Sequence, residues 1–194
     1  MAGLLAHQPL PGGDGVGIVT NVGGPGIVCA DACAANGLRV EALAAATRRQ
    51  LAARLSPNAS VANPVDMIAS ASAEDYEHAI LAVAADPSVD AVIAIFIQPL
   101  ATGTDEVAAA VHRAATSPQA ASVPILGVFM HRGEPPPALA GGGVRVPAYP
   151  STEDAVRALA HAVRHARRRA EPPSAPPAVD MSGFVASGLQ PPFA

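Results

Sequence analysis

The chain has 194 residues, of which 50% are hydrophobic and only 3% aromatic, and this length suits one domain with its own core. The net charge of −4 and the scarcity of aromatic residues exclude a basic or base-stacking surface for nucleic acid. The sequence shows neither a signal-peptide pattern nor an apolar run of the ~20 residues that span a membrane, so we expect a cytoplasmic protein without a membrane partner.

Residues 1–15 are rich in Pro and Gly, and we expect a lead-in or linker with a stub of helix at its start. The run Val16–Thr20 predicts a strand buried on both faces, because it is short, apolar and rich in β-branched residues. A Gly-rich segment follows, and an Ala-rich helix is predicted from about Gly26 to Asn36, where Gly37 ends it.

The next segment predicts a brief second strand at Leu38–Val40 and a helix near residues 43–55. A long connection follows. Ser72, with Asp75 three positions later, has the pattern of a capping box and is expected to begin a helix over about 73–85.

The strongest strand signal is Val89–Ile97, whose length and β-branched residues argue against a helix. Thr104 is predicted to cap a helix that runs to about Ala115. The remaining elements are a fourth strand, a weak fifth strand and a last helix begun by Ser151 and Asp154, with predicted ranges 123–130, 144–146 and 151–168.

Strands that alternate with helices at this spacing indicate βαβ units and a parallel sheet. We therefore predict an α/β fold of the flavodoxin-like type, with a doubly wound five-stranded parallel sheet in the order 2-1-3-4-5. The domain is expected to span residues 16–169. Residues 170–194 are Pro-rich and without periodicity, so we expect a disordered tail there or the start of a lost domain.

Ligands bind to such sheets beyond the carboxyl ends of the strands, where the strand order reverses. The predicted phosphate-binding residues follow the first strand there: Asn21, Gly23, Gly24, Pro25 and Gly26. Free N–H groups and the positive end of the helix favour a phosphate, and proline suits a first helical turn. The spacing alone leaves an empty strand-to-helix turn equally open.

Asn63-Pro64-Val65-Asp66-Met67 is the second candidate. Pro64 favours an extended Asn63, while Asp66 either caps backbone amides or carries chemistry, and its spacing favours capping. With Gln98, which ends the third strand, Asn63, Pro64 and Asp66 form a predicted accessory loop region.

No residue of this chain is predicted to be catalytic or to bind a metal. Cys29 and Cys33 lie four positions apart without further ligands at metal spacing, so we interpret them as buried thiols. His161 and His165 are interpreted as complements of a helix C-terminus. The sequence contains no Lys, which excludes a Walker-type or Schiff-base lysine.

Three segments together resemble one family: Gly17–Ile27, Asp31-Ala32 and Asn63–Met67. They are similar to the C-terminal flavodoxin-like, or CoA-ligase, domain of the NDP- or ADP-forming acyl-CoA (acetyl-CoA) synthetases, relatives of succinyl-CoA synthetase. The resemblance covers roughly residues 4–168. The two longer motifs are specific only in combination.

In that family, acyl-CoA, ADP and phosphate are interconverted with free acid, CoA and ATP. The resemblance implies that the helix after Gly23–Gly26 supplies an N-terminus that stabilises a phosphohistidine on a partner domain. It also implies two partners, in cis or as separate subunits: a CoA-binding domain that carries the phosphohistidine, and an ATP-grasp domain. CoA, ADP or ATP and Mg²⁺ would act through those domains, and we expect no tightly bound cofactor here.

The chain lacks a Ser-His-Thr-Gly-like segment, so we expect the phosphorylated histidine in another domain and the isolated chain to be inactive. The alternative is a non-catalytic interaction or regulatory module, such as one derived from an acetyltransferase-fused synthetase. The sequence leaves open the acyl substrate, the oligomeric state and the role of residues 170–194.

Overall fold

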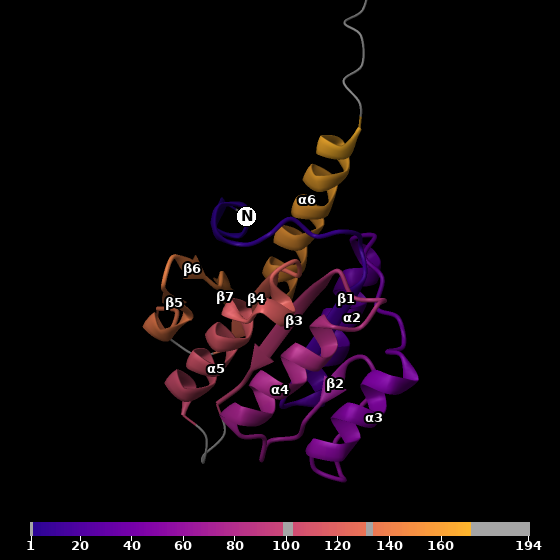
Figure 1. The fold of residues 1–194 in the computed structure, drawn as a ribbon, viewed down its shortest axis with the longest axis vertical. Helices are drawn as coiled ribbons and strands as arrows, with labels where there is room; N and C mark the ends of the chain where they lie inside the picture. Colours follow the sequence, from indigo (N-terminus) through magenta and orange to yellow (C-terminus); the bar gives the residue numbers. More distant parts are fainter. Residues whose placement is uncertain (1, 99–102, 131–133, 172–194) are drawn as a thin grey trace, which may run out of the picture.

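The computed structural model describes residues 2–98, 103–130 and 134–171. A five-stranded sheet forms its centre (Figure 1), and every pair of neighbouring strands in it is parallel. In spatial order the strands are β2 (Val65–Asp66), β1 (Val16–Thr20), β3 (Ala91–Phe96), β4 (Ile125–Phe129) and β7 (Ala148–Tyr149). The predicted doubly wound α/β fold is confirmed.

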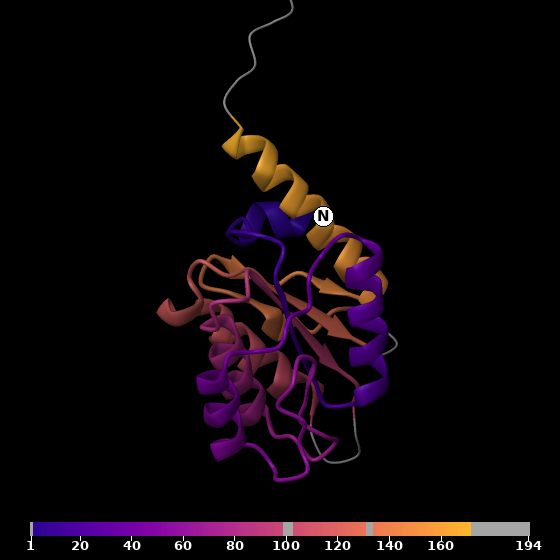
Figure 2. The same ribbon diagram turned by 90° about the vertical axis from the view of Figure 1, so that its right-hand side faces the viewer.

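Helices cover both faces of the sheet, as the edge-on view in Figure 2 shows. One layer holds α3 (Ala45–Arg54), α4 (Ala73–Ala84) and α5 (Thr104–Thr116), and the other holds α1 (Ala2–His7), α2 (Gly23–Ala35) and α6 (Thr152–Ala170). Strand β3 divides its side chains between them. Val92, Ala94 and Phe96 pack in the α4–α5 cluster, whereas Ala91, Ile93 and Ile95 pack in the α2–α6 cluster. Burial on both faces explains why this strand reads as a continuous apolar run.

The predicted second strand is wrong. Leu38–Val40 contributes only a single parallel bridge, from Arg39 to Gly15, and the strand beside β1 is Val65–Asp66. Between these two pairings along β1, the side-chain amide of Asn63 takes the place of a strand, since its Oδ1 accepts from the Ile18 N–H at 3.0 Å. Three short segments therefore provide the hydrogen-bond partners of the backbone groups along one edge of β1. An ordinary neighbouring strand would provide these partners from one segment.

The predicted fifth strand is also displaced. Val144–Arg145 (β6) pairs antiparallel with Ala140–Gly141 (β5) in a small separate hairpin, and the fifth strand of the main sheet is β7. Gly142 and Gly143 join the hairpin strands with φ values of 55° and 84°. Two successive positive φ angles are what a tight two-residue hairpin turn requires, and glycine adopts them without strain.

Two of the three predicted helix caps form in the structure. The Ser72 and Asp75 capping box that begins α4 is confirmed, as is the Ser151 cap that begins α6. Thr104 is not a cap, since α5 begins at Thr104 after an extended Gly103 that offers no side chain. Two 3-10 turns, η1 (Pro118–Ala120) and η2 (Pro137–Leu139), complete the described elements.

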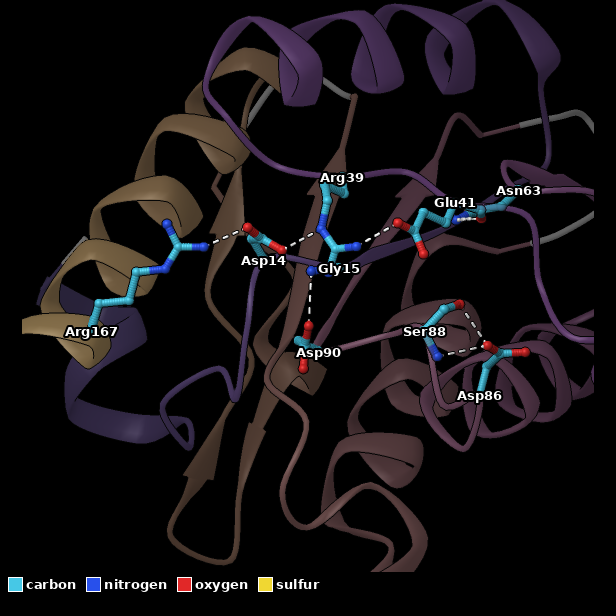
Figure 3. A network of polar contacts seen from close by, with 9 residues as sticks. All are labelled: Asp14, Gly15, Arg39, Glu41, Asn63, Asp86, Ser88, Asp90 and Arg167. Atoms are coloured by element: carbon cyan, nitrogen blue, oxygen red, sulfur yellow. Dashed lines mark hydrogen bonds and ion pairs between the residues drawn. The ribbon is translucent and has the colours of Figure 1, made fainter. Parts of the chain in front are cut away.

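The lead-in packs along the amino ends of the strands. Leu4 of α1 is only 1% exposed and lies in the cluster that contains α6. The Gln8 side chain accepts from the N–H of Ile125 at 3.0 Å and donates to the carbonyl of Arg145 at 2.9 Å. The carboxylate of Asp14 accepts from the guanidinium groups of Arg39 and Arg167 (Figure 3). The hydrogen bond from Arg39 holds the pKa of Asp14 below its usual range.

Asp86 links the start of α3 to the segment that leads into β3 by hydrogen bonds. This side chain is 2% exposed; it accepts from the Ala44 N–H at 2.8 Å and from the N–H and hydroxyl of Ser88 at 3.0 and 2.6 Å. Burial works to raise the pKa of Asp86, but hydrogen bonds from Ser88 and Thr47 outweigh it and keep the pKa below its usual value. The carboxylate is therefore held in its charged form by the fold.

Replacing Asp86 with Asn is expected to lower the free energy of unfolding at about pH 7 by about 2 kcal/mol, because an amide nitrogen would face donors that need an acceptor. Since the folded pKa is depressed, the carboxylate stabilises above its unfolded pKa, and this contribution disappears as pH falls through the folded value. Urea unfolding of both proteins at about pH 7 and about pH 3 checks this. The difference between them should shrink in acid, and a constant difference would contradict the assignment.

Candidate functional site

The crevice lies where β1 and β3 end, because the chain leaves these neighbouring strands toward opposite sides. Asn21 closes the two strand ends against each other: its Nδ2 donates to the Ile97 carbonyl at 2.9 Å and its Oδ1 accepts from the Ile97 N–H at 3.1 Å. The side chain is buried and engaged by both backbone groups of one residue. The structure thus places Asn21 beneath the site, as a residue that positions the start of α2.

Among the residues that the structure describes, no side chain caps the first turn of α2. Val22 occupies the N-cap position without a side-chain hydrogen bond, and the turn contains no acidic residue. The Val22 N–H is already satisfied, since it donates to Oγ1 of Thr20 at 3.1 Å. The N–H groups of Gly23 and Gly24, which come next, have no intrahelical partner at a helix start, and Pro25 has no N–H to satisfy. Bare amides and the positive helix end make this turn suitable for an anion.

The helix begins three residues earlier than expected, at Gly23 instead of about Gly26. Gly26 is then a point of close packing. A methyl group there would lie 3.1 Å from Cγ2 of Thr20 and 3.2 Å from Cβ of Pro64. Gly24 differs, because a methyl group there would meet no atom within 4 Å among the described residues. The space over Gly24 is therefore open to a ligand.

Asp66, the last residue of β2 beside β1, lies close to the same turn. Its Oδ2 lies 2.8 Å from the point where a Cβ of Gly23 would stand, and its Oδ1 accepts from the Ile68 N–H at 3.0 Å. Ile68 has a φ of 62°, an unusual angle for a β-branched residue. The local hydrogen bond is the predicted capping role, and the second carboxylate oxygen faces the helix start.

The other residues of the predicted accessory loop region lie in different places. Pro64 packs against Gly26, whereas the Asn63 side chain points to the amino half of β1, where it donates to the carbonyls of Val16 and Glu41. Gln98 is exposed after the end of β3. The structure thus brings Gly23, Gly24, Pro25, Gly26, Pro64 and Asp66 together, with Asn21 beneath them, whereas the Asn63 side chain points away from this cluster.

Two residues that support the site are absent from the sequence-based prediction. Thr20 is fully buried, and its hydroxyl bonds both the N–H and the carbonyl of Val22, which shapes the entry into α2. Tyr76 is buried too, with its hydroxyl donating to the Ile95 carbonyl at 2.7 Å and its ring edge against Phe96. Burial raises the pKa of Tyr76, so the phenol stays neutral. For Thr20 the available signal was a hydroxyl side chain three positions before the helix, two before its N-cap Val22.

Cys29 and Cys33 are both buried in α2, as predicted. A hydrogen bond with Cys33, together with burial, raises the pKa of Cys29, which leaves a neutral and unreactive thiol. The described part of the chain holds no group of three His, Cys, Asp or Glu side chains that could bind a metal ion. Within those residues, no helix is both long and apolar enough to cross a membrane.

The histidines give the site no base in the described residues. His112 places Nε2 3.2 Å from the carbonyl oxygens of Gly141 and Val144 and so attaches the hairpin to α5. His161 and His165 are exposed on α6. His131 lies outside the described residues.

The fold and the site define a class: a doubly wound α/β domain whose crevice presents an uncapped, glycine-lined helix start. The chain belongs to the Ligase-CoA domain family, whose model matches residues 16–171.

Named relatives agree with that assignment. The chain is 47% identical over 96 residues to the alpha subunit of acetate–CoA ligase (ADP-forming) II of Pyrococcus furiosus, a match that covers 50% of this chain and 21% of the relative. A crystal structure of a Pyrococcus horikoshii protein superposes with a TM-score of 0.73 at 35% identity, covering 84% of this chain and 38% of that one.

A third relative was solved with ligands. Acetyl-coenzyme A synthetase 1 of Candidatus Korarchaeum cryptofilum, in complex with phosphate and ADP, superposes with a TM-score of 0.76 at 28% identity. The match covers 86% of this chain and 36% of the other. The chain thus spans between about a fifth and two fifths of the length of these three relatives.

Proposed function

We propose that this chain acts as one domain of an ADP-forming acid–CoA ligase, which converts acyl-CoA, ADP and phosphate into free acid, CoA and ATP. Its contribution is the start of α2, which stabilises a phosphohistidine on a partner domain. The observation that carries this proposal is the pair of amides at Gly23 and Gly24 without an intrahelical partner, with open space over Gly24, in a member of the Ligase-CoA family.

The charge distribution favours a histidine-borne phosphoryl group over free phosphate. The amides and the helix end attract the phosphoryl oxygens. The carboxylate of Asp66, beside Gly23, would repel a free anion but suits an N–H donor. A phosphorylated imidazole offers both when its other ring nitrogen is protonated, and a carboxylate that accepts this hydrogen bond would favour the protonated ring and orient it.

The rest of the reaction belongs to other parts of the assembly. A CoA-binding domain would supply the histidine, and an ATP-grasp domain would transfer its phosphoryl group to ADP, using Mg²⁺. These domains would be held in the same polypeptide or in separate subunits. The chain's short span relative to its relatives supports this division, and so does the lack of a Ser-His-Thr-Gly-like segment in its sequence.

Reconstitution tests the proposal. The full chain is mixed with a CoA-binding domain and an ATP-grasp domain encoded by the same genome, and ATP formation from acetyl-CoA, ADP and phosphate is followed. Labelling of the partner's histidine by radioactive phosphate and acetyl-CoA, without ADP, isolates the first half of the reaction. We expect both signals to require this chain. If the partners label and form ATP equally well without it, the chain is an interaction or regulatory module instead.

A further inference from the structure

Helix α2 carries an unusual outer surface for a helix at the edge of a domain. Asp31 is its only charged residue among 13. Among the residues that the structure describes, the large apolar side chains that stand exposed are Ile27, at 62%, and Val28, at 47%. Helices of this composition are normally covered by other elements, but no element of the described chain covers these two side chains.

The two exposed residues lie directly beside the bare amides. Positions three and four apart share a helix face, so Ile27 and Val28 are neighbours of Gly24. The Cα–Cβ bonds of a helix tilt toward its N-terminus, which directs both side chains toward the glycine turn. Because Gly23 and Gly24 have no side chains, Ile27 and Val28 are the first large side chains of α2 after Pro25, and the Asp66 carboxylate lies beside Gly23.

A histidine side chain is short, so a phosphohistidine that reaches these amides must bring its own backbone close to this face of α2. Residues next to that histidine would then lie within reach of the exposed side chains of Ile27 and Val28. Asp31, one turn further along and exposed, limits the apolar surface to this short stretch.

We propose that Ile27 and Val28 form an apolar collar that binds apolar residues flanking the phosphohistidine on the partner's loop; this rests on the proposed function. The collar contributes affinity through buried area and excludes water from the phosphoryl–amide contacts, which strengthens them in a less polar surrounding. It also selects the partner, since polar or charged flanking residues would bury unfavourably against it.

Short peptides with a non-hydrolysable phosphohistidine analogue test the collar. One peptide places Leu on both sides of the analogue and the other places Ser there, and each is also made with unmodified histidine. Binding to the full chain is measured by calorimetry. We expect the phosphorylated Leu peptide to bind about tenfold or more tightly than the phosphorylated Ser peptide, from burial of exposed apolar area.

The double variant Ile27→Ser, Val28→Ser should lose this preference while keeping its thermal midpoint, because both side chains are exposed. The variant Ile27→Leu, Val28→Leu should retain it. If the phosphorylated peptides bind the wild-type chain but show no preference for Leu, or a preference that survives the serine changes, the collar is wrong and the phosphate site stands. If phosphorylation does not improve binding at all, the proposed function itself fails, and the collar with it.

Discussion

Replacing Gly24 with Asp is expected to lower ATP formation by the reconstituted ligase about hundredfold, the size of effect seen when a transition-state hydrogen-bond donor is lost. The new carboxylate would stand in the open space above the first turn of α2, where a methyl group meets no described atom within 4 Å. It would neutralise the positive helix end and repel the phosphoryl group. The measurement is the rate of ATP formation at saturating partner domains.

The fold should tolerate this change, which separates a functional effect from unfolding. Gly24→Ala offers the first control, since Ala is favoured over Gly in helices by up to about 1 kcal/mol and fits the open space. Ala46→Asp, at an exposed position near the start of α3, adds the same charge away from the crevice and should leave the rate unchanged. An unaffected rate in Gly24→Asp would remove α2 from the mechanism.

Replacing Asn63 with Ala is expected to lower the free energy of unfolding by about 3 kcal/mol, from three lost hydrogen bonds of about 1 kcal/mol each. The Asn63 amide accepts from the Ile18 N–H and donates to the carbonyls of Val16 and Glu41 at 2.8 and 2.9 Å. Val16 and Ile18 lie in a buried strand, so their backbone groups would lose their partner without easy access to water. Urea unfolding at neutral pH measures the loss.

Two variants sharpen this result. Asn63→Asp keeps an acceptor for Ile18 but removes both donors and sets a charge against two carbonyl oxygens, so it should be at least as damaging as Ala. Asn58→Ala, at an exposed position, should change stability by less than about 0.5 kcal/mol. Equal effects at Asn58 and Asn63 would show that the edge of β1 does not depend on this side chain.

The Asn63–Met67 motif shows how far a pattern can be interpreted without coordinates. Its resemblance to a family was enough to single it out, but three of its residues have different roles. Asn63 completes the edge of β1, Pro64 packs on Gly26, and Asp66 reaches the start of α2. These roles depend on which strand the motif pairs with, and no local signal in Val65–Asp66 identifies a two-residue strand.

The Gly-rich turn was predictable for a different reason. Its glycines, its proline and the apolar strand before it are neighbours in sequence, so their consequences for backbone geometry are local. What remained undecided from the residues was whether the turn is empty. Our proposal adopts the occupied alternative because the first turn of α2 has no side-chain cap at Val22 and the space over Gly24 is open among the described residues.

Local order in this protein follows directly from its residues: the apolar runs of β1 and β3, the serine caps of α4 and α6, and the alternation that makes the sheet parallel. Hydrophobic period and capping act within a few residues, so one sequence suffices to predict them. Three features arise only when the chain folds. The edge of β1 is paired by Asn63 and Val65–Asp66, β7 takes the place predicted for Val144–Val146, and Asp66 meets Gly23. Two of them join residues some 40 or more positions apart, and the other depends on which of two weak short segments forms the strand. In such cases packing and the satisfaction of backbone hydrogen bonds across the whole domain outweigh local preference.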